Sequence, residues 1–488
     1  MIALKKRLLT DVRPVEVLRY FEDMTFIPRE SANEKEMAEY LVDFADRNGL
    51  GCHMDENYNV LMTKPASPGY EDHPGVIIQA HMDMVCEKLS GSEHDFAKDP
   101  IVFTVEDGWI TAKETSLGAD DGIGLAIGLA VMADKSLKHP EIELLCTADE
   151  ERGLIGIEKF DFSLLKGSRV INIDGADEHF VIAGCAGGPI VRTDFPMKTK
   201  PADRQKSYYR LTLGGLRGGH SGEDIHRGRA NANKTLVRVL MAIREEMDFD
   251  LAEINGGLKF NAIPRDAEAV IAVNSNDTGA LMQLTDMYAR TLSEEYEVND
   301  PGITLRCEPA DSRDSVFDDD LKMNVLDFIN FADIGVIRRN IYNPAMIETS
   351  ANMGIVSTDD EKVRVMIMAR SSRTSMFDMM SQKIRRLSER LGGICHEDGR
   401  FPAWEYRADS PLREAYKDAY SSLYGKEPAE VVYHAGLEPA TFAEKMTPVP
   451  DMIAIGPDVR NLHAPGESLN IASTERVWNS VIKLLEKL

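Results

Sequence analysis

The stretch "LLCTADEERGLIG" (Leu144–Gly156) contains a cluster of acidic residues whose charge must be compensated elsewhere in the chain. An apolar run typical of a buried strand leads directly into three acidic residues, Asp149, Glu150 and Glu151, with Arg152 as the adjacent base. Like charges this close raise the free energy of the fold unless a positive partner compensates them. Because the nearby sequence offers no lysine cluster, we expect the compensating charge to come from elsewhere.

The composition limits the classes of protein that the chain can represent. At 488 residues it exceeds what one hydrophobic core usually supports, so two or more domains are expected. Its net charge of −25 argues against binding to nucleic acid or to an anionic membrane surface, because both need a basic footprint. No apolar run resembles a signal peptide or spans a bilayer, and six cysteines without a Cys-x-x-Cys pattern predict a reducing cytoplasm.

Apolar strands alternate with helical segments in the first part of the chain. Four segments read as strands: "YNVLMT", "VIIQAHMDMV", "EIELLCTAD" and "RVINID". The small-residue segment "GADDGIGLAIGLAVMAD" reads as a helix between the second and third of them. An earlier helix follows Ser31 and Glu34, which form a capping-box pattern, and would end at Gly49. This alternation predicts an α/β sheet covered by helices.

The pattern changes at "AGCAGGP" (Ala183–Pro189). From there to about residue 400, strand pairs alternate with amphipathic helices, and after "GRFPAWEYR" the opening pattern returns. We therefore predict an α/β domain of residues 1–189 and 401–488, with a central sheet flanked by helices. An inserted α+β domain, residues 190–400, interrupts it.

Acidic and histidine side chains follow these strands or lie in adjoining loops. Taken singly, each has an ordinary explanation as a structural histidine, a helix cap, a turn residue or a solvated loop residue. As a set they indicate one common site, because the carboxyl ends of parallel strands meet at one edge of a sheet. That edge would gather His81, Asp120, Glu151, Asp174 and His463. Such oxygen and nitrogen donors suit one or two divalent ions of zinc, manganese or cobalt, which would supply the missing positive charge.

The motifs "HMD", "GADDG", "TADEERG", "NIDGAD" and "LHAPGE" occur in the order found in a known family. They resemble the co-catalytic metallopeptidases that include carnosinases, aminoacylases and glutamate carboxypeptidases, and most closely the bacterial aminoacyl-histidine dipeptidase branch. The resemblance covers essentially the whole chain. It implies two metal ions, with zinc favoured over manganese or cobalt, and Asp120 as the ligand that bridges them. His81 and Asp174 would complete one coordination shell, and Glu151 and His463 the other.

The same resemblance implies further roles. Glu150 would be the general base, Asp83 would orient His81, and the peptide between Asp120 and Asp121 would be cis. The insertion would be a lid or dimerisation domain of a homodimer.

The insertion contributes its own predicted site residues. The resemblance implies that His220, in "LRGGHSGEDIHRG", stabilises an oxyanion, often from the partner subunit, although as structure alone the segment is a turn before a helix. Further predicted substrate contacts are Asn261, Arg370, Gly436 and Glu438. The last two lie in "HAGLEP", which departs from the Gly-Gly-Ser-type loop of many relatives.

The resemblance implies a metal-dependent dipeptidase that acts on dipeptides with a free amino terminus, Xaa-His dipeptides among them. The alternative is an N-acyl amino-acid deacylase or a carboxypeptidase of the same family. A serine-hydrolase elbow is excluded because it would need glycine where Glu223 stands. A phosphate-binding loop is disfavoured because the two aspartates of "GADDGIG" would repel phosphate. A non-catalytic binding protein is disfavoured because no expected ligand is missing.

Overall fold

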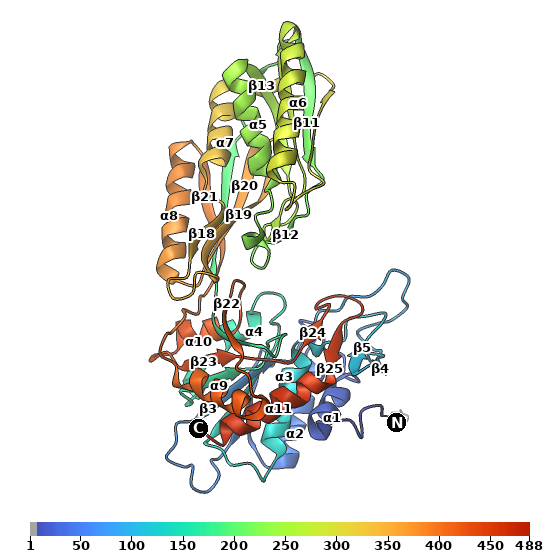
Figure 1. Cartoon of the computed structure of the whole chain (residues 1–488), viewed down its shortest axis with the longest axis vertical. Coiled ribbons are helices and arrows are strands. Elements are labelled where there is room, and N and C mark those ends of the chain that lie inside the picture. The colour runs from blue at the N-terminus through green and yellow to red at the C-terminus, as the bar shows by residue number, and fades with distance from the viewer. Residues whose placement is uncertain (1–6) are drawn as a thin grey trace. The chain divides into compact units, whose positions relative to one another are not determined.

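The computed structural model describes residues 7–488, which divide into two compact units (Figure 1). The first unit comprises the chain up to Cys185 together with Trp404–Tyr433 and Leu437–Leu488. The second comprises Ala186–Ala403 and the short stretch His434–Gly436. The junctions predicted from sequence are 189/190 and 400/401, and the structure has them at 185/186 and 403/404.

A sheet of eight strands forms the middle of the first unit as described in residues 7–488. Its strands run in the order β1 (Gly51–Met54), β2 (Val60–Lys64), β6 (Ile142–Thr147), β3 (Val76–His81), β7 (Arg169–Asn172), β23 (Asp451–Ala454), β8 (Phe180–Cys185) and β22 (Ala429–Tyr433). The strands predicted from the opening segment are β2, β3, β6 and β7. Because β3 pairs in parallel with both β6 and β7, the carboxyl ends of these three strands meet at one edge.

Successive side chains of the strands enter two different cores, as the two-residue period of a strand requires. In β3, Ile78 joins a cluster shared with the helices of one face, whereas Ile77 joins a cluster on the opposite face. The first face carries α1 (Val15–Met24), α2 (Lys35–Asn48), α3 (Ala119–Ala133), α9 (Pro411–Tyr424) and α11 (Ile471–Leu485); the second carries α4 (Ile155–Lys159) and α10 (Pro439–Lys445). The prediction of an α/β sheet covered by helices is confirmed (Figure 1).

The predicted capping box before α2 is wrong, although the helix ends at Gly49 as expected, with a left-handed φ of 68°. The Ser31 hydroxyl donates to Asp83 Oδ2 at 2.7 Å instead of capping the helix. The Glu34 carboxylate accepts from the backbone N–H groups of Ala32 and Asp149. Tertiary partners have therefore taken both side chains that the local pattern assigned to the helix start.

A second sheet forms the core of the inserted unit, and its strand pairings are antiparallel. The strand order is β16 (Thr304–Pro309), β11 (Lys206–Gly214), β15 (Ala267–Asn274), β13 (Phe249–Gly256), β19 (Ile347–Thr358), β20 (Lys362–Ser371), β9 (Gly188–Pro196) and β21 (Ile394–Phe401), with β18 (Gly335–Arg339) paired to β19. The helices that pack on it are α5 (Ala232–Glu246), α6 (Thr278–Glu295), α7 (Asp319–Phe331) and α8 (Thr374–Arg390).

This sheet consists of two halves with the same topology, a repeat that the sequence pattern does not reveal. One half runs β11, α5, β13, β15, α6, β16, and the other runs β9, α7, β19, β20, α8, β21. The strand pairs of the first half are β13 with β15, β15 with β11 and β11 with β16. The corresponding pairs of the second half are β19 with β20, β20 with β9 and β9 with β21. The halves join at their second strands, where Gly256 of β13 is paired with Val356 of β19. The predicted α+β insertion therefore contains an internal structural repeat.

Two further observations bear on the predictions from composition. All six cysteines are free thiols. None of the helices in residues 7–488 has the length and apolarity that crossing a membrane requires.

Candidate metal centre

The predicted ligands lie at the edge where β3, β6 and β7 end. His81 is the last residue of β3, and Asp174 follows the end of β7 by two residues. Glu151 lies in the loop after β6, and Asp120 lies at the start of α3. His463 lies in the loop between β24 (Val459–Arg460) and β25 (Ser468–Asn470), two short antiparallel strands of the first unit. Five separate segments thus contribute one side chain each.

Asp120 occupies the middle of this arrangement. Its Oδ1 atom lies 3.1 Å from His81 Nε2, and its Oδ2 atom lies 3.0 Å from His463 Nε2. On the first side, His81 Nε2 is also 3.8 Å from Asp174 Oδ1, and on the second, His463 Nε2 is 3.0 Å from Glu151 Oε1. The two oxygens of one carboxylate therefore face two separate groups of ligand atoms. The peptide between Asp120 and Asp121 is cis, as the family resemblance implies.

Asp83 connects the first group to the acidic loop of the opening stretch. Its Oδ1 atom is 3.4 Å from Nδ1 of the buried His81, so the opposite ring nitrogen, Nε2, faces the other ligands. The Asp83 carboxylate also accepts the backbone N–H groups of Glu150 and Glu151, at 3.0 and 3.2 Å. A single carboxylate thus fixes both the orientation of the imidazole and the path of the loop that carries the predicted base.

The charges at this edge perturb one another strongly. Burial raises the pKa of Glu150 well above its usual range, and the neighbouring Glu151 raises it further, against the influence of His81. Burial and the adjacent Asp120 likewise raise the pKa of Asp174. Carboxylates crowded in this way are stabilised in their charged form by a cation placed among them. Arg152 does not provide that cation, because its guanidinium pairs with Asp149, with Nε 2.6 Å from Oδ1.

The ligand atoms fit two divalent ions. His81, Asp120 and Asp174 form one group in which the ligand atoms lie within 4.8 Å of one another, and Asp120, Glu151 and His463 form a second. Asp120 belongs to both groups. Mixed carboxylate and imidazole donors are the set that zinc, manganese and cobalt accept in proteins.

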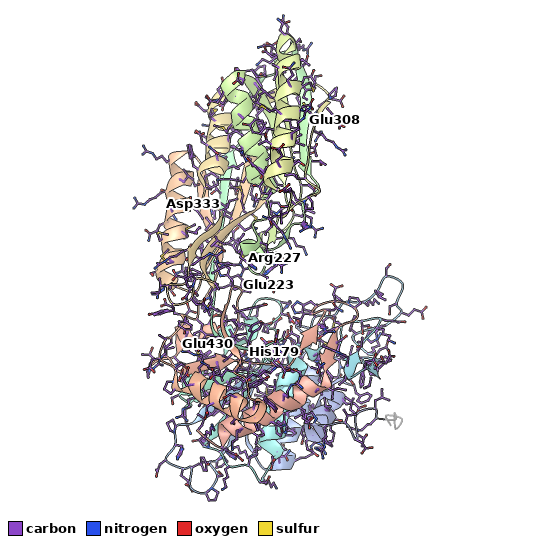
Figure 2. The ribbon with its side chains drawn as sticks, in the orientation of Figure 1. His179, Glu223, Arg227, Glu308, Asp333 and Glu430 are labelled. Carbon is purple, nitrogen blue, oxygen red and sulfur yellow. The ribbon has the colours of Figure 1, made fainter. Side chains whose placement is uncertain are left out.

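Another group that meets the same distance criterion lies outside this edge. It consists of Asp177, His179 and Asp458, and His179, labelled in Figure 2, is exposed by its accessible surface. The Nε2 atom of His179 is 3.0 Å from the ammonium nitrogen of Lys426, a fixed positive charge. The Asp177 carboxylate faces the other ring nitrogen, with Oδ1 3.0 Å from Nδ1. Because a positive charge on the same imidazole ring's far side opposes the binding of a cation, we assign no metal to this group.

Glu438, a predicted substrate contact, is completely buried in the first unit. Its Oε2 atom accepts hydrogen bonds from Thr147 Oγ1 at 2.9 Å and from the side-chain amide of Gln79. Burial raises the pKa of Glu438 to about 7. Gly436, predicted with it, belongs to the stretch that is part of the second unit. The role of both residues as substrate contacts stays a prediction. The burial of Glu438 favours a structural role, in which it stabilises the strands that carry the predicted ligands.

The inserted unit brings three other predicted residues into one neighbourhood. His220 pairs with Ala262 between β12 (Gly219–His220) and β14 (Ala262–Ile263), directly beside Asn261. Burial, and then the charge of Arg370, lower the pKa of His220. The neutral ring accepts the backbone N–H of Glu223 (Figure 2) at Nδ1, 3.3 Å away, which leaves its proton on Nε2. His220 is therefore a hydrogen-bond donor through Nε2.

A fourth residue of this neighbourhood was missed in the sequence. His434 is buried in the second unit, with Nε2 2.7 Å from Ser350 Oγ. Burial, and then Arg370 and His220, lower the pKa of His434 to about 3, so its ring is neutral at physiological pH. Its only signal in the sequence is its position at the start of "HAGLEP", the loop in which the sequence predicts Gly436 and Glu438 as substrate contacts.

Comparisons with known proteins agree with this architecture. Residues 211–300 match the peptidase dimerisation domain family. The chain is 34% identical over 480 residues to the cytosol non-specific dipeptidase of Escherichia coli (strain K12), covering 98% of this chain and 99% of that protein. The crystal structure of aminoacylhistidine dipeptidase from Vibrio alginolyticus superposes with a TM-score of 0.92 at 35% identity, covering 99% of this chain and 98% of that one. A tripeptidase from Staphylococcus aureus shares the fold, with a TM-score of 0.60 at 15% identity, covering 98% of each chain.

An α/β domain that gathers two ligand groups around a shared aspartate, interrupted by a peptidase dimerisation domain, defines a metallopeptidase. The near-complete match to a curated relative narrows this class. The chain belongs to the M20 peptidase family that includes the cytosol non-specific dipeptidase of Escherichia coli.

Proposed function

We propose that this protein is a metal-dependent dipeptidase that would hold two divalent ions, with Asp120 as a ligand in both groups. The observation that carries the proposal is the placement of the Asp120 carboxylate, with one oxygen 3.1 Å from His81 Nε2 and the other 3.0 Å from His463 Nε2. The predicted metal ligands are His81, Asp120, Glu151, Asp174 and His463. Zinc is the metal we favour, with manganese and cobalt as the other ions that suit these donors.

The bound ions would polarise the scissile carbonyl and lower the pKa of an attacking water. Glu150 accepts the proton that this water loses as its oxygen attacks the carbonyl carbon. The same carboxyl then delivers the proton to the amine nitrogen as the C–N bond breaks. Asp83 holds Glu150 in place through the backbone N–H at 3.0 Å. His220, neutral and protonated on Nε2, donates to the developing oxyanion.

A panel of small substrates tests the proposed reaction. Metal-loaded protein is expected to release histidine from Ala-His, whereas N-acetyl amino acids should be hydrolysed far more slowly. Liquid chromatography of the released amino acids measures both rates in one preparation, with the β-alanyl dipeptide β-Ala-His as a third substrate. Faster hydrolysis of N-acetyl amino acids than of Ala-His would identify a deacylase and contradict the proposal.

His220→Ala is expected to lower kcat by about 10²–10³, the usual cost of removing one oxyanion donor. Its metal content and unfolding temperature should stay close to those of the wild type, because His220 is not among the predicted ligands. Steady-state kinetics with Ala-His, together with metal analysis of the same samples, measures these effects.

His226→Ala is the matched control for this variant. His226 is an exposed histidine in the same segment, and we expect its removal to leave kcat unchanged. If His220→Ala turns over substrate at the rate of the control, "GGHSG" is only a turn and the donor must be found elsewhere.

Two features of the relatives support further predictions. The match of residues 211–300 to a peptidase dimerisation domain supports a homodimer. The name of the Escherichia coli relative supports the cytoplasmic location predicted from the cysteines.

A further inference from the structure

The carboxylate of Glu467 is enclosed by four consecutive backbone N–H groups. Oε2 accepts from Leu117 at 2.6 Å and Gly118 at 2.9 Å, and Oε1 accepts from Ala119 at 2.8 Å and Asp120 at 3.3 Å. Glu467 is only 2% exposed, so water does not substitute for these donors. Successive amides that converge on one anion form a rigid concavity, and here the anion is a side chain of the protein itself.

A buried guanidinium holds the same segment through carbonyl groups. Arg29 Nη1 donates to the backbone oxygens of Met82 and Asp83, each at 3.1 Å, and Nη2 donates to that of Gly118. Arg29 is 3% exposed, and burial lowers the pKa of its guanidinium against the opposing charge of Glu467. The forked donor geometry of arginine allows one side chain to reach two separate loops.

Gly118 is therefore held at both of its backbone polar groups. Its N–H is bound by Glu467 and its C=O by Arg29. The residue has a left-handed φ of 71°, which favours glycine. A Cβ atom there would lie 2.4 Å from Arg29 Nη2 and 2.7 Å from Met84 Sδ. The segment that ends two residues later at Asp120 has little freedom to shift.

These contacts join three of the segments that carry the predicted ligands. Met82 and Asp83 directly follow His81, Gly118 precedes Asp120, and Glu467 follows His463 by four residues. We propose that Arg29 and Glu467 are positioning residues, which clamp Gly118 and so hold the carboxylate of Asp120 between His81 and His463. The inference rests on the proposed function, because it assigns the clamp to the metal centre proposed above.

Glu467→Gln is the sharper of two substitutions that test the clamp. The amide keeps one oxygen but turns an NH₂ group toward backbone N–H groups, which leaves two buried donors without an acceptor. Arg29→Gln removes the fork that connects the loop after His81 to Gly118. We expect each variant to bind Zn²⁺ about 10–100-fold more weakly, the usual effect of losing a residue that orients a metal ligand.

Two buried residues of the first unit provide matched controls. Glu143 is 2% exposed and accepts the backbone N–H groups of Lys166 and Gly167, away from the ligand loops. Arg413 is 3% exposed and donates to the backbone oxygens of Arg407 and Ala408. Glu143→Gln and Arg413→Gln remove the same chemical groups from equally buried positions. They should lower thermal stability as the clamp variants do, but leave the affinity for Zn²⁺ unchanged.

Zn²⁺ affinity is measured on the full-length, metal-stripped chain by competition with a chromogenic chelator. Circular dichroism checks the fold of each variant, and Arg29→Lys and Glu467→Asp, which keep the charges, should regain part of the lost affinity. If the clamp variants bind Zn²⁺ as tightly as the controls, the inference is wrong while the proposed function stands. If the wild type binds none of Zn²⁺, Mn²⁺ and Co²⁺, the proposed function fails, and the inference that rests on it fails with it. If Arg29→Gln or Glu467→Gln does not fold, the Zn²⁺ affinities of Arg29→Lys and Glu467→Asp are compared with those of the controls instead.

Discussion

Glu150→Gln is expected to lose about 10²–10⁴ of turnover, the range that a positioned general base contributes. The amide has nearly the shape of the carboxylate but cannot accept a proton from the attacking water. Metal binding should persist, because Glu150 is not in either of the two groups that share Asp120. Initial rates with Ala-His and metal analysis of the same protein measure both properties.

Glu151→Gln is the matched control, since it makes the same change at the next residue. Glu151 belongs to the group with Asp120 and His463, so its amide variant should lose metal as well as activity. The two roles are exchanged if Glu150→Gln loses metal while Glu151→Gln retains it. The structure also places His81, Glu150 and Glu151 within one ligand-sized group, which makes this comparison necessary.

Removal of metal is expected to abolish hydrolysis completely. Burial, together with the neighbouring carboxylates, raises the pKa of both Glu150 and Asp174, and cations are needed to hold these carboxylates in their charged forms together. Without the ions, the attacking water also keeps the high pKa of bulk water. Dialysis against a chelator should eliminate activity toward Ala-His, and added Zn²⁺, Mn²⁺ or Co²⁺ should restore it.

Circular dichroism before and after chelation supplies the control for this experiment, because an unfolded chain would also be inactive. Chelated protein that keeps its fold and full activity would remove the basis for the mechanism.

The sequence predicts the first unit well because its signals are local. Each predicted strand is a short apolar run, and the acidic or histidine residue that follows it needs only the parallel pairing of β3, β6 and β7 to reach one edge. His463 is predicted as a ligand only from the order of the motifs, because no local pattern distinguishes it from a solvated histidine.

What the sequence does not predict depends on contacts between distant residues. Ser31 and Glu34 form a perfect capping pattern, yet Asp83 and Asp149 bind their side chains in the folded chain. Arg29 carries no signal at all, because its partners are backbone carbonyls of residues 82, 83 and 118. Glu467 stands at the end of "LHAPGE", but its four backbone donors become visible only when that loop lies against residues 117–120.

The sequence does not reveal the repeat in the inserted unit, for a different reason. Its halves share strand order and helix positions but no obvious residue pattern, and one half is inserted between β9 and α7 of the other. A search for similar consecutive segments cannot detect a nested arrangement of this kind.

The central claim, that Asp120 is shared by two metal ions, is tested most directly by counting ions per chain. Native mass spectrometry of the reconstituted wild type should show two divalent ions. Glu151→Ala removes a ligand from only one of the two groups that share Asp120, so it should show one. Asp120→Ala removes a ligand from both groups, so we expect it to show fewer than one ion per chain and no hydrolysis of Ala-His. Two ions bound to folded Asp120→Ala would contradict the claim.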